Sequence, residues 1–138
     1  MASKETMGPI ITLNSSHIID HVNQLLEIEG SQLWFGNIEK YRDTIPSHLG
    51  FIQPTAVYIP LEQINESNID LVTKEIFGPV QVITSYDDID KVLSICEQMN
   101  DHLTAAVVSN DPTFVNHVLG RSVNGTTYVG EKARTTGA

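Results

Sequence analysis

Residues 80–129 read VQVITSYDDIDKVLSICEQMNDHLTAAVVSNDPTFVNHVLGRSVNGTTYV, and strand-like and helix-like apolar patterns alternate along this stretch. Short runs rich in small and β-branched residues at 80–83, 103–108 and 126–129 indicate strands. Apolar residues at helical spacing separate these runs: Ile89, Val92, Leu93, Cys96 and Met99 before the second, and Phe114, Val115, Val118 and Leu119 before the third. Because strands that alternate with helices need crossover connections, we predict an α/β fold with a largely parallel sheet.

Polar residues mark where the two predicted helices begin. Residues 85–88 match a capping pattern, and the acids at 87, 88 and 90 suit a first turn, where the helix dipole favours negative charge. The same aspartates lack the glycine and the closing glutamate of a calcium loop, so capping is the better interpretation. The next helix begins near Asn110-Asp111-Pro112, with proline in its first turn.

The first half of the chain has weaker patterns. A helix over about residues 17–28 is predicted from the helical spacing of Ile18, Ile19, Val22, Leu25 and Leu26. Strands are predicted at 32–35 and 56–59, because both runs are short, apolar and closed by turn residues. Residues 39–50 are polar and contain proline and glycine, which predicts a loop, and residues 61–70 are expected to be irregular with a helical turn.

Composition limits the classes of function. The chain has 138 residues, which suits one domain, and 41% of them are hydrophobic, as in globular proteins. Its net charge of -9 would repel phosphate backbones, so we expect no nucleic-acid partner. No apolar run reaches membrane-spanning length, and residues 1–6 do not resemble a secretory or organelle-targeting segment. One cysteine excludes an internal disulfide framework.

Three groups of side chains were weighed as sites. Cys96 lies on the predicted inward face of a helix, where a cysteine behaves as a small hydrophobe, so we do not expect it to be a nucleophile. His17 and His21 are four residues apart, a spacing that can bind metal, but no third ligand supports a metal site and surface histidines are the better interpretation. The tail from Arg134 to Thr136 is compatible with an anion site or with a frayed end.

Residues 74–80 read KEIFGPV, which closely resembles the Glu-x-Phe-Gly-Pro signature of aldehyde dehydrogenases, and here too it leads from a loop into a strand. The segments at 7–10 and 51–55 also fall in the order of that family. The stretches LTAAVVSNDP (103–112), VNGTTY (123–128) and ARTTGA (133–138) resemble the plant-type delta-1-pyrroline-5-carboxylate dehydrogenases. The resemblance covers nearly the whole chain. It implies that residues 1–138 are the C-terminal part of a catalytic domain, without the NAD-binding domain.

The resemblance assigns roles to two residues. Glu75 matches the family glutamate whose carboxylate accepts hydrogen bonds from the nicotinamide ribose, and Phe77 matches the aromatic side chain that packs beside the nicotinamide ring. Taken alone, Glu75 would be a solvated loop acid and Phe77 a core residue. The family nucleophile and general base would lie outside this chain, so the resemblance implies no catalytic residue here, and we expect no metal site.

The implied activity is the NAD-dependent oxidation of an aldehyde to a carboxylate, most specifically of L-glutamate 5-semialdehyde to glutamate in proline catabolism. The resemblance further implies a small-molecule aldehyde substrate, a homo-oligomer when complete, and a mitochondrial matrix location, or otherwise a cytoplasmic one. The isolated chain is expected to be inactive. An alternative is a non-catalytic interaction protein that docks on a full-length aldehyde dehydrogenase.

Overall fold

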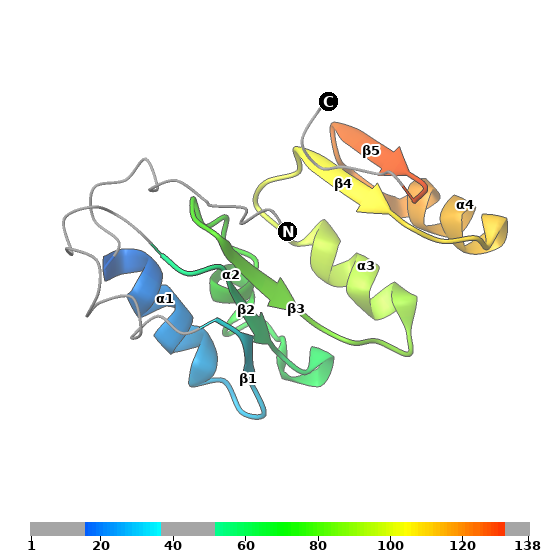
Figure 1. The fold of residues 1–138 in the computed structure, drawn as a ribbon. Helices are drawn as coiled ribbons and strands as arrows, with labels where there is room; N and C mark the ends of the chain where they lie inside the picture. Colours follow the sequence, from blue (N-terminus) through cyan, green and yellow to red (C-terminus); the bar gives the residue numbers. More distant parts are fainter. Residues whose placement is uncertain (1–15, 37–51, 132–138) are drawn as a thin grey trace. The chain divides into compact units, whose positions relative to one another are not determined.

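The computed structural model describes residues 16–36 and 52–131. These form two compact units, one ending at Ser85 and the other starting at Tyr86 (Figure 1). Each unit is described by itself below. The predicted loop at 39–50 and the tail around Arg134 lie outside the described residues.

The first unit combines a three-stranded sheet with helices. Its elements are α1 (Ser16–Leu26), β1 (Gln32–Phe35), β2 (Thr55–Tyr58), the 3-10 helix η3 (Leu61–Gln63), α2 (Ile69–Val72) and β3 (Val80–Ile83). The strand order is β1-β2-β3. β1 is antiparallel to β2, whereas β2 and β3 are parallel, with Thr55 opposite Val80 and Tyr58 opposite Ile83.

One face of this sheet is covered by α1 and α2. Side chains of α1, of the central strand and the residue after it, and of α2 meet in one buried cluster, made of Val22, Leu25, Val57, Ile59 and Val72. Because side chains alternate along a strand, Tyr58 points to the opposite face. There Trp34 stacks on Tyr58, with ring centroids 4.6 Å apart and planes 2° apart, and the Tyr58 hydroxyl hydrogen-bonds the Ser85 hydroxyl at 2.9 Å.

Gly36 explains how β1 can end beside β2. Its φ of +96° lies in the left-handed region, which L side chains rarely adopt. A Cβ at this position would also lie 2.6 Å from the carbonyl oxygen of Pro54. Only glycine therefore allows the chain to leave β1 this close to the start of β2.

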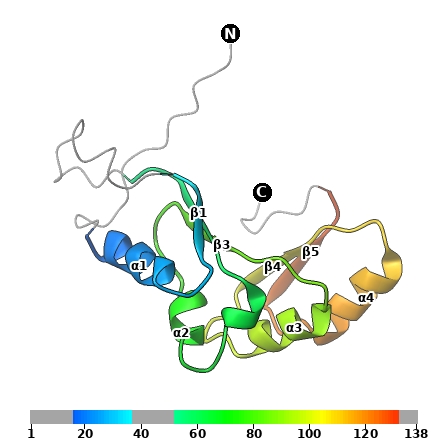
Figure 2. The ribbon, with the colours of Figure 1, turned by 90° about the horizontal axis from the view of Figure 1, so that it is seen from below.

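The second unit consists of two parallel strands and two helices. α3 (Ile89–Glu97) precedes β4 (Thr104–Val107), and α4 (Pro112–Arg121) makes the crossover from β4 to β5 (Thr126–Val129). Both helices lie on the same side of the strands (Figure 2). Aspartates cap both: Asp88 Oδ1 accepts the Asp90 N–H at 3.0 Å, and Asp111 Oδ1 accepts the Thr113 N–H at 2.8 Å.

Charged side chains link α3 to α4. Arg121 donates to Glu97 Oε1 from Nε at 3.0 Å and from Nη2 at 2.8 Å, and to Asp90 Oδ1 from Nη1 at 2.9 Å. His117 Nε2 lies 2.8 Å from the same Asp90 oxygen. The hydrogen bond with His117, followed by the effects of Arg121, lowers the pKa of Asp90. All four side chains are at least one-third exposed, so solvent screens this network.

The predicted α/β fold class is confirmed. The strands predicted at 32–35, 80–83 and 126–129 have the observed bounds, and the others are correct to within one residue. Two details differ. α3 begins at Ile89, so Asp88 is its cap and Asp90 is the acid of its first turn, whereas Asp87 precedes the helix. The strands of residues 80–129 also lie in two sheets, because β3 pairs with β2 from the first half of the chain.

None of the helices in the described part of the chain is long and apolar enough to cross a membrane.

Candidate functional site

The signature segment forms a tight turn between α2 and β3. At its start, the Thr73 N–H and hydroxyl both donate to the Ile69 carbonyl, at 2.9 and 2.7 Å. At its end, the Gly78 N–H donates to the Ile76 carbonyl at 2.8 Å, which closes a three-residue turn centred on Phe77. The Thr55 N–H donates to the Pro79 carbonyl at 2.8 Å and joins the turn to β2. The backbone that carries residues 75–77 is therefore held at both ends.

This turn presents both predicted cofactor-binding side chains to solvent. Phe77 is 73% exposed, although an isolated phenylalanine is normally buried in a core. Glu75 is exposed as well, and among the described residues its carboxylate has no hydrogen-bond or ion-pair partner. The turn thus holds a hydrogen-bond acceptor and an exposed aromatic ring two positions apart, a pair of side chains that can contact hydroxyl groups and a planar ring.

Gly78 sets the distance between the turn and α1. A Cβ at Gly78 would lie 2.7 Å from Cδ1 of Ile18, closer than side chains approach in folded proteins. Ile18 is fully buried, so its side chain has little room to move. The glycine of the signature thus allows the turn to pack directly on the helix.

The structure corrects the interpretation of one histidine. His17 is exposed, as predicted, but His21 is only 8% exposed, so its assignment to the surface was wrong. The pattern could have indicated this, because His21 lies three residues after Ile18 and four before Leu25, both fully buried, and therefore on the apolar face of α1. Burial, followed by the nearby charge of Lys74, lowers the pKa of His21. Among the described residues, no three His, Cys, Asp or Glu side chains gather as metal ligands would.

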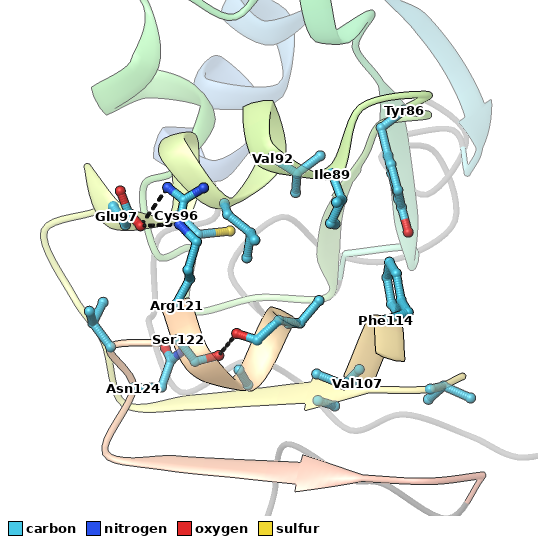
Figure 3. A pocket seen from close by; sticks show the side chains of 16 residues that line it. Tyr86, Ile89, Val92, Cys96, Glu97, Val107, Phe114, Arg121, Ser122 and Asn124 are labelled. Atoms are coloured by element: carbon cyan, nitrogen blue, oxygen red, sulfur yellow. Dashed lines mark hydrogen bonds and ion pairs between the residues drawn. The ribbon is translucent and has the colours of Figure 1, made fainter. Parts of the chain in front are cut away.

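Cys96 lies in the other unit, beside a cavity of about 290 Å³ (Figure 3). The cavity lies between α3, β4 and α4, and most of its walls are apolar, with Tyr86 and Phe114 together at one end. Burial, followed by the charge of Glu97, raises the pKa of the Cys96 thiol, so the reactive thiolate is disfavoured. These surroundings are the opposite of those that activate a cysteine nucleophile.

Comparisons with known proteins agree on one family. The sequence model of the aldehyde dehydrogenase family matches residues 1–137. The chain is 54% identical over 136 residues to a probable aldehyde dehydrogenase of Linum usitatissimum. It is 52% identical over 137 residues to the mitochondrial delta-1-pyrroline-5-carboxylate dehydrogenase 12A1 of Arabidopsis thaliana. Each alignment covers 96% of this chain but 25% of the relative, so the chain spans about a quarter of the length of these proteins.

Solved structures show the same fold. A succinic semialdehyde dehydrogenase from Streptococcus pyogenes, crystallised with NADP+, matches 94% of this chain and 26% of its own, with a TM-score of 0.69 and 19% identity. A betaine aldehyde dehydrogenase from Staphylococcus aureus matches 94% of this chain and 25% of its own, with a TM-score of 0.67 and 22% identity. With the family model matching residues 1–137 and these folds in agreement, the chain belongs to the aldehyde dehydrogenase family.

Proposed function

We propose that this chain is the C-terminal part of the catalytic domain of an NAD-dependent enzyme that oxidises L-glutamate 5-semialdehyde to glutamate. The substrate is suggested by the 52% identity to a plant pyrroline-carboxylate dehydrogenase over nearly the whole chain. The name of that relative also motivates the proposed mitochondrial location and role in proline catabolism. We further propose a homo-oligomeric complete enzyme.

In this proposal, Glu75 and Phe77 hold the nicotinamide riboside. The bound dinucleotide would accept the hydride that the aldehyde loses. The Glu75 carboxylate accepts hydrogen bonds from the ribose hydroxyls, and charge-assisted bonds of this kind are the stronger ones. The Phe77 ring packs beside the nicotinamide and restricts its movement. The observation that carries this assignment is the exposure of both side chains on a turn whose backbone is held at both ends.

The choice of NAD over NADP rests on the family resemblance. The nicotinamide ribose is the same in both dinucleotides, so a contact from Glu75 does not discriminate between them. Two of the structurally similar enzymes were crystallised with NADP. Cofactor preference therefore has to be measured, with both dinucleotides, in the experiment described next.

A chimeric enzyme tests the proposal, because this chain aligns with a contiguous quarter of the Arabidopsis relative. This chain would replace the matching segment of that enzyme. Formation of NADH from NAD and of NADPH from NADP would then be measured with pyrroline-5-carboxylate. We expect an active chimera in which Glu75→Gln raises the KM for the cofactor about 10- to 100-fold, the value of a lost hydrogen bond to a charged group. Phe77→Ala is expected to have a smaller effect of the same sign.

Two controls accompany this measurement. Glu66→Gln removes an exposed acid outside the turn and should leave the KM unchanged. The 138-residue chain alone should form no NADH above background, since it offers no activated thiol among its described residues. A well-folded chimera whose KM does not respond to Glu75→Gln would show that the assignment of Glu75 is wrong.

A further inference from the structure

Phe77 lies in an unfavourable place for an apolar side chain. It is 73% exposed, although an aromatic ring gains free energy when it leaves water. It is the central residue of a tight turn, so its ring is not held out of the protein by strand pairing or by a helix. The unit must therefore contain a contact that keeps the turn, and the ring with it, from settling onto the neighbouring surface.

Ile18 of α1 supplies that contact, because its side chain fills the space between the helix and the turn. The three atoms nearest to a Cβ built on Gly78 all belong to Ile18: Cδ1 at 2.7 Å, and Cγ1 and Cγ2 at 3.8 Å. Ile18 is fully buried, yet it is not a member of the apolar cluster that joins α1 to the sheet. The residue that follows Phe77 thus rests directly on this side chain.

Hydrogen bonds limit the other movements of the turn. The bonds of Thr73 and Pro79 described above hold its two ends. The Val80 N–H also donates to the Gly78 carbonyl at 2.8 Å, which fixes Gly78 to the start of β3. These bonds maintain the ends and the internal shape of the turn. The packing of Gly78 on Ile18 then sets how far the turn stands from α1.

We propose that Ile18 is a positioning residue: by filling the space between α1 and the turn, it keeps Phe77 exposed and in place beside Glu75. Ile18 acts through the backbone of Gly78 and not through contact with a ligand. The consequence for the dinucleotide rests on the proposed function, in which Glu75 and Phe77 hold the nicotinamide riboside.

Ile18→Ala tests the structural part of this proposal in the full 138-residue chain. The substitution leaves a hole under Gly78, and the turn should sink toward it, because protein interiors are close-packed and the movement buries part of the Phe77 ring. With phenylalanine rings labelled with ¹³C, a soluble gadolinium chelate reports their exposure through paramagnetic relaxation. This relaxation should decrease for Phe77, whereas that of Phe114, which lies in the other unit, should stay the same.

Val22→Ala is the matched control. Val22 is as fully buried as Ile18 and lies one helical turn further along α1, but it packs in the apolar cluster with the sheet. Its truncation should destabilise the unit and leave Phe77 exposed. Ile18→Val removes only the Cδ1 methyl group that faces Gly78, so it replaces Ile18→Ala if that variant does not fold. It should lower the relaxation of Phe77 in the same direction by a smaller amount.

A complementary substitution gives a stricter test. In the Ile18→Ala background, Gly78→Ala directs a Cβ toward the space that Cδ1 of Ile18 has left. The φ of Gly78 is not positive, so an alanine there does not strain the backbone. The double variant should therefore recover part of the exposure of Phe77 that Ile18→Ala loses. The proposal is wrong if this recovery is absent, if the folded Ile18 variants leave Phe77 unchanged, or if Val22→Ala lowers its exposure equally.

The chimeric enzyme gives the functional readout. Ile18→Ala should raise the KM for the dinucleotide about 2- to 10-fold, the value of one contact between aromatic rings, and leave the KM for the aldehyde unchanged. Val22→Ala should change neither KM, although it also destabilises the unit. A dinucleotide KM that responds to Glu75→Gln but not to Ile18→Ala would show that the positioning role is wrong. If it responds to neither, while the exposure of Phe77 changes as expected, Ile18 still supports the turn and the assignment of Glu75 and Phe77 to cofactor binding fails.

Discussion

Adding one methyl group at Gly78 tests how tightly the turn packs on α1. The Cβ of Gly78→Ala would meet the buried Cδ1 of Ile18 at 2.7 Å. We expect Gly78→Ala to destabilise the unit by about 1–3 kcal/mol, the usual cost of overpacking a core. The fluorescence of Trp34, the single tryptophan of the chain, reports unfolding of this unit in a denaturant titration.

Ile18→Val supplies the matched control, because it removes the methyl group that would collide. By itself it should cost about 0.5–1.5 kcal/mol as a small cavity. Combined with Gly78→Ala, it should destabilise less than the sum of the two changes, since each relieves the other. Strict additivity would mean that the two residues do not contact one another in solution.

Two substitutions in or beside helix α4 should change the stability of its unit in opposite directions. Asp111→Ala removes the carboxylate that accepts the Thr113 N–H, and loss of such a cap costs about 1 kcal/mol. A Cβ at Gly120, near the other end of the helix, would meet no atom within 4 Å, so Gly120→Ala should stabilise by about 0.5–1 kcal/mol. Thermal unfolding followed by circular dichroism would measure both. A gain from Asp111→Ala would contradict the observed cap.

The elements were predictable where a local pattern determines them. Strand β3 and helix α4 follow from β-branched runs and from the Asp111-Pro112 start, because propensity and capping act within a few residues. Pairing of β3 with β2 could not be predicted, since it depends on contacts between distant segments. Glu75 and Phe77 became candidates through their motif. The burial of His21 was visible in the helical period.

At the scale of the whole molecule, the exposed edge of the first sheet determines how the isolated chain should behave. Among the strands at 16–36 and 52–131, β1 pairs with β2 alone. All four residues of β1 are exposed, and none of them is charged. Leu33, Trp34 and Phe35 are 43%, 55% and 58% exposed. Uncharged apolar edge strands pair readily with other strands. The net charge of -9 opposes association, but at physiological ionic strength this repulsion is screened beyond about 8 Å.

We therefore expect the 138-residue chain to self-associate at physiological salt, and Phe35→Lys to reduce that association by placing a charge on the edge. Phe77→Lys is the matched control: it removes an even more exposed aromatic side chain, 73% against 58%, and changes the net charge by the same unit, but it lies outside the strand. Sedimentation velocity over a range of concentrations would compare the three proteins. Because each substitution makes the chain less negative, neither can act through net repulsion. If the chains associate through the strand edge, Phe35→Lys should lower the average sedimenting mass and Phe77→Lys should not. If both substitutions lower it equally, the association comes from general hydrophobicity instead.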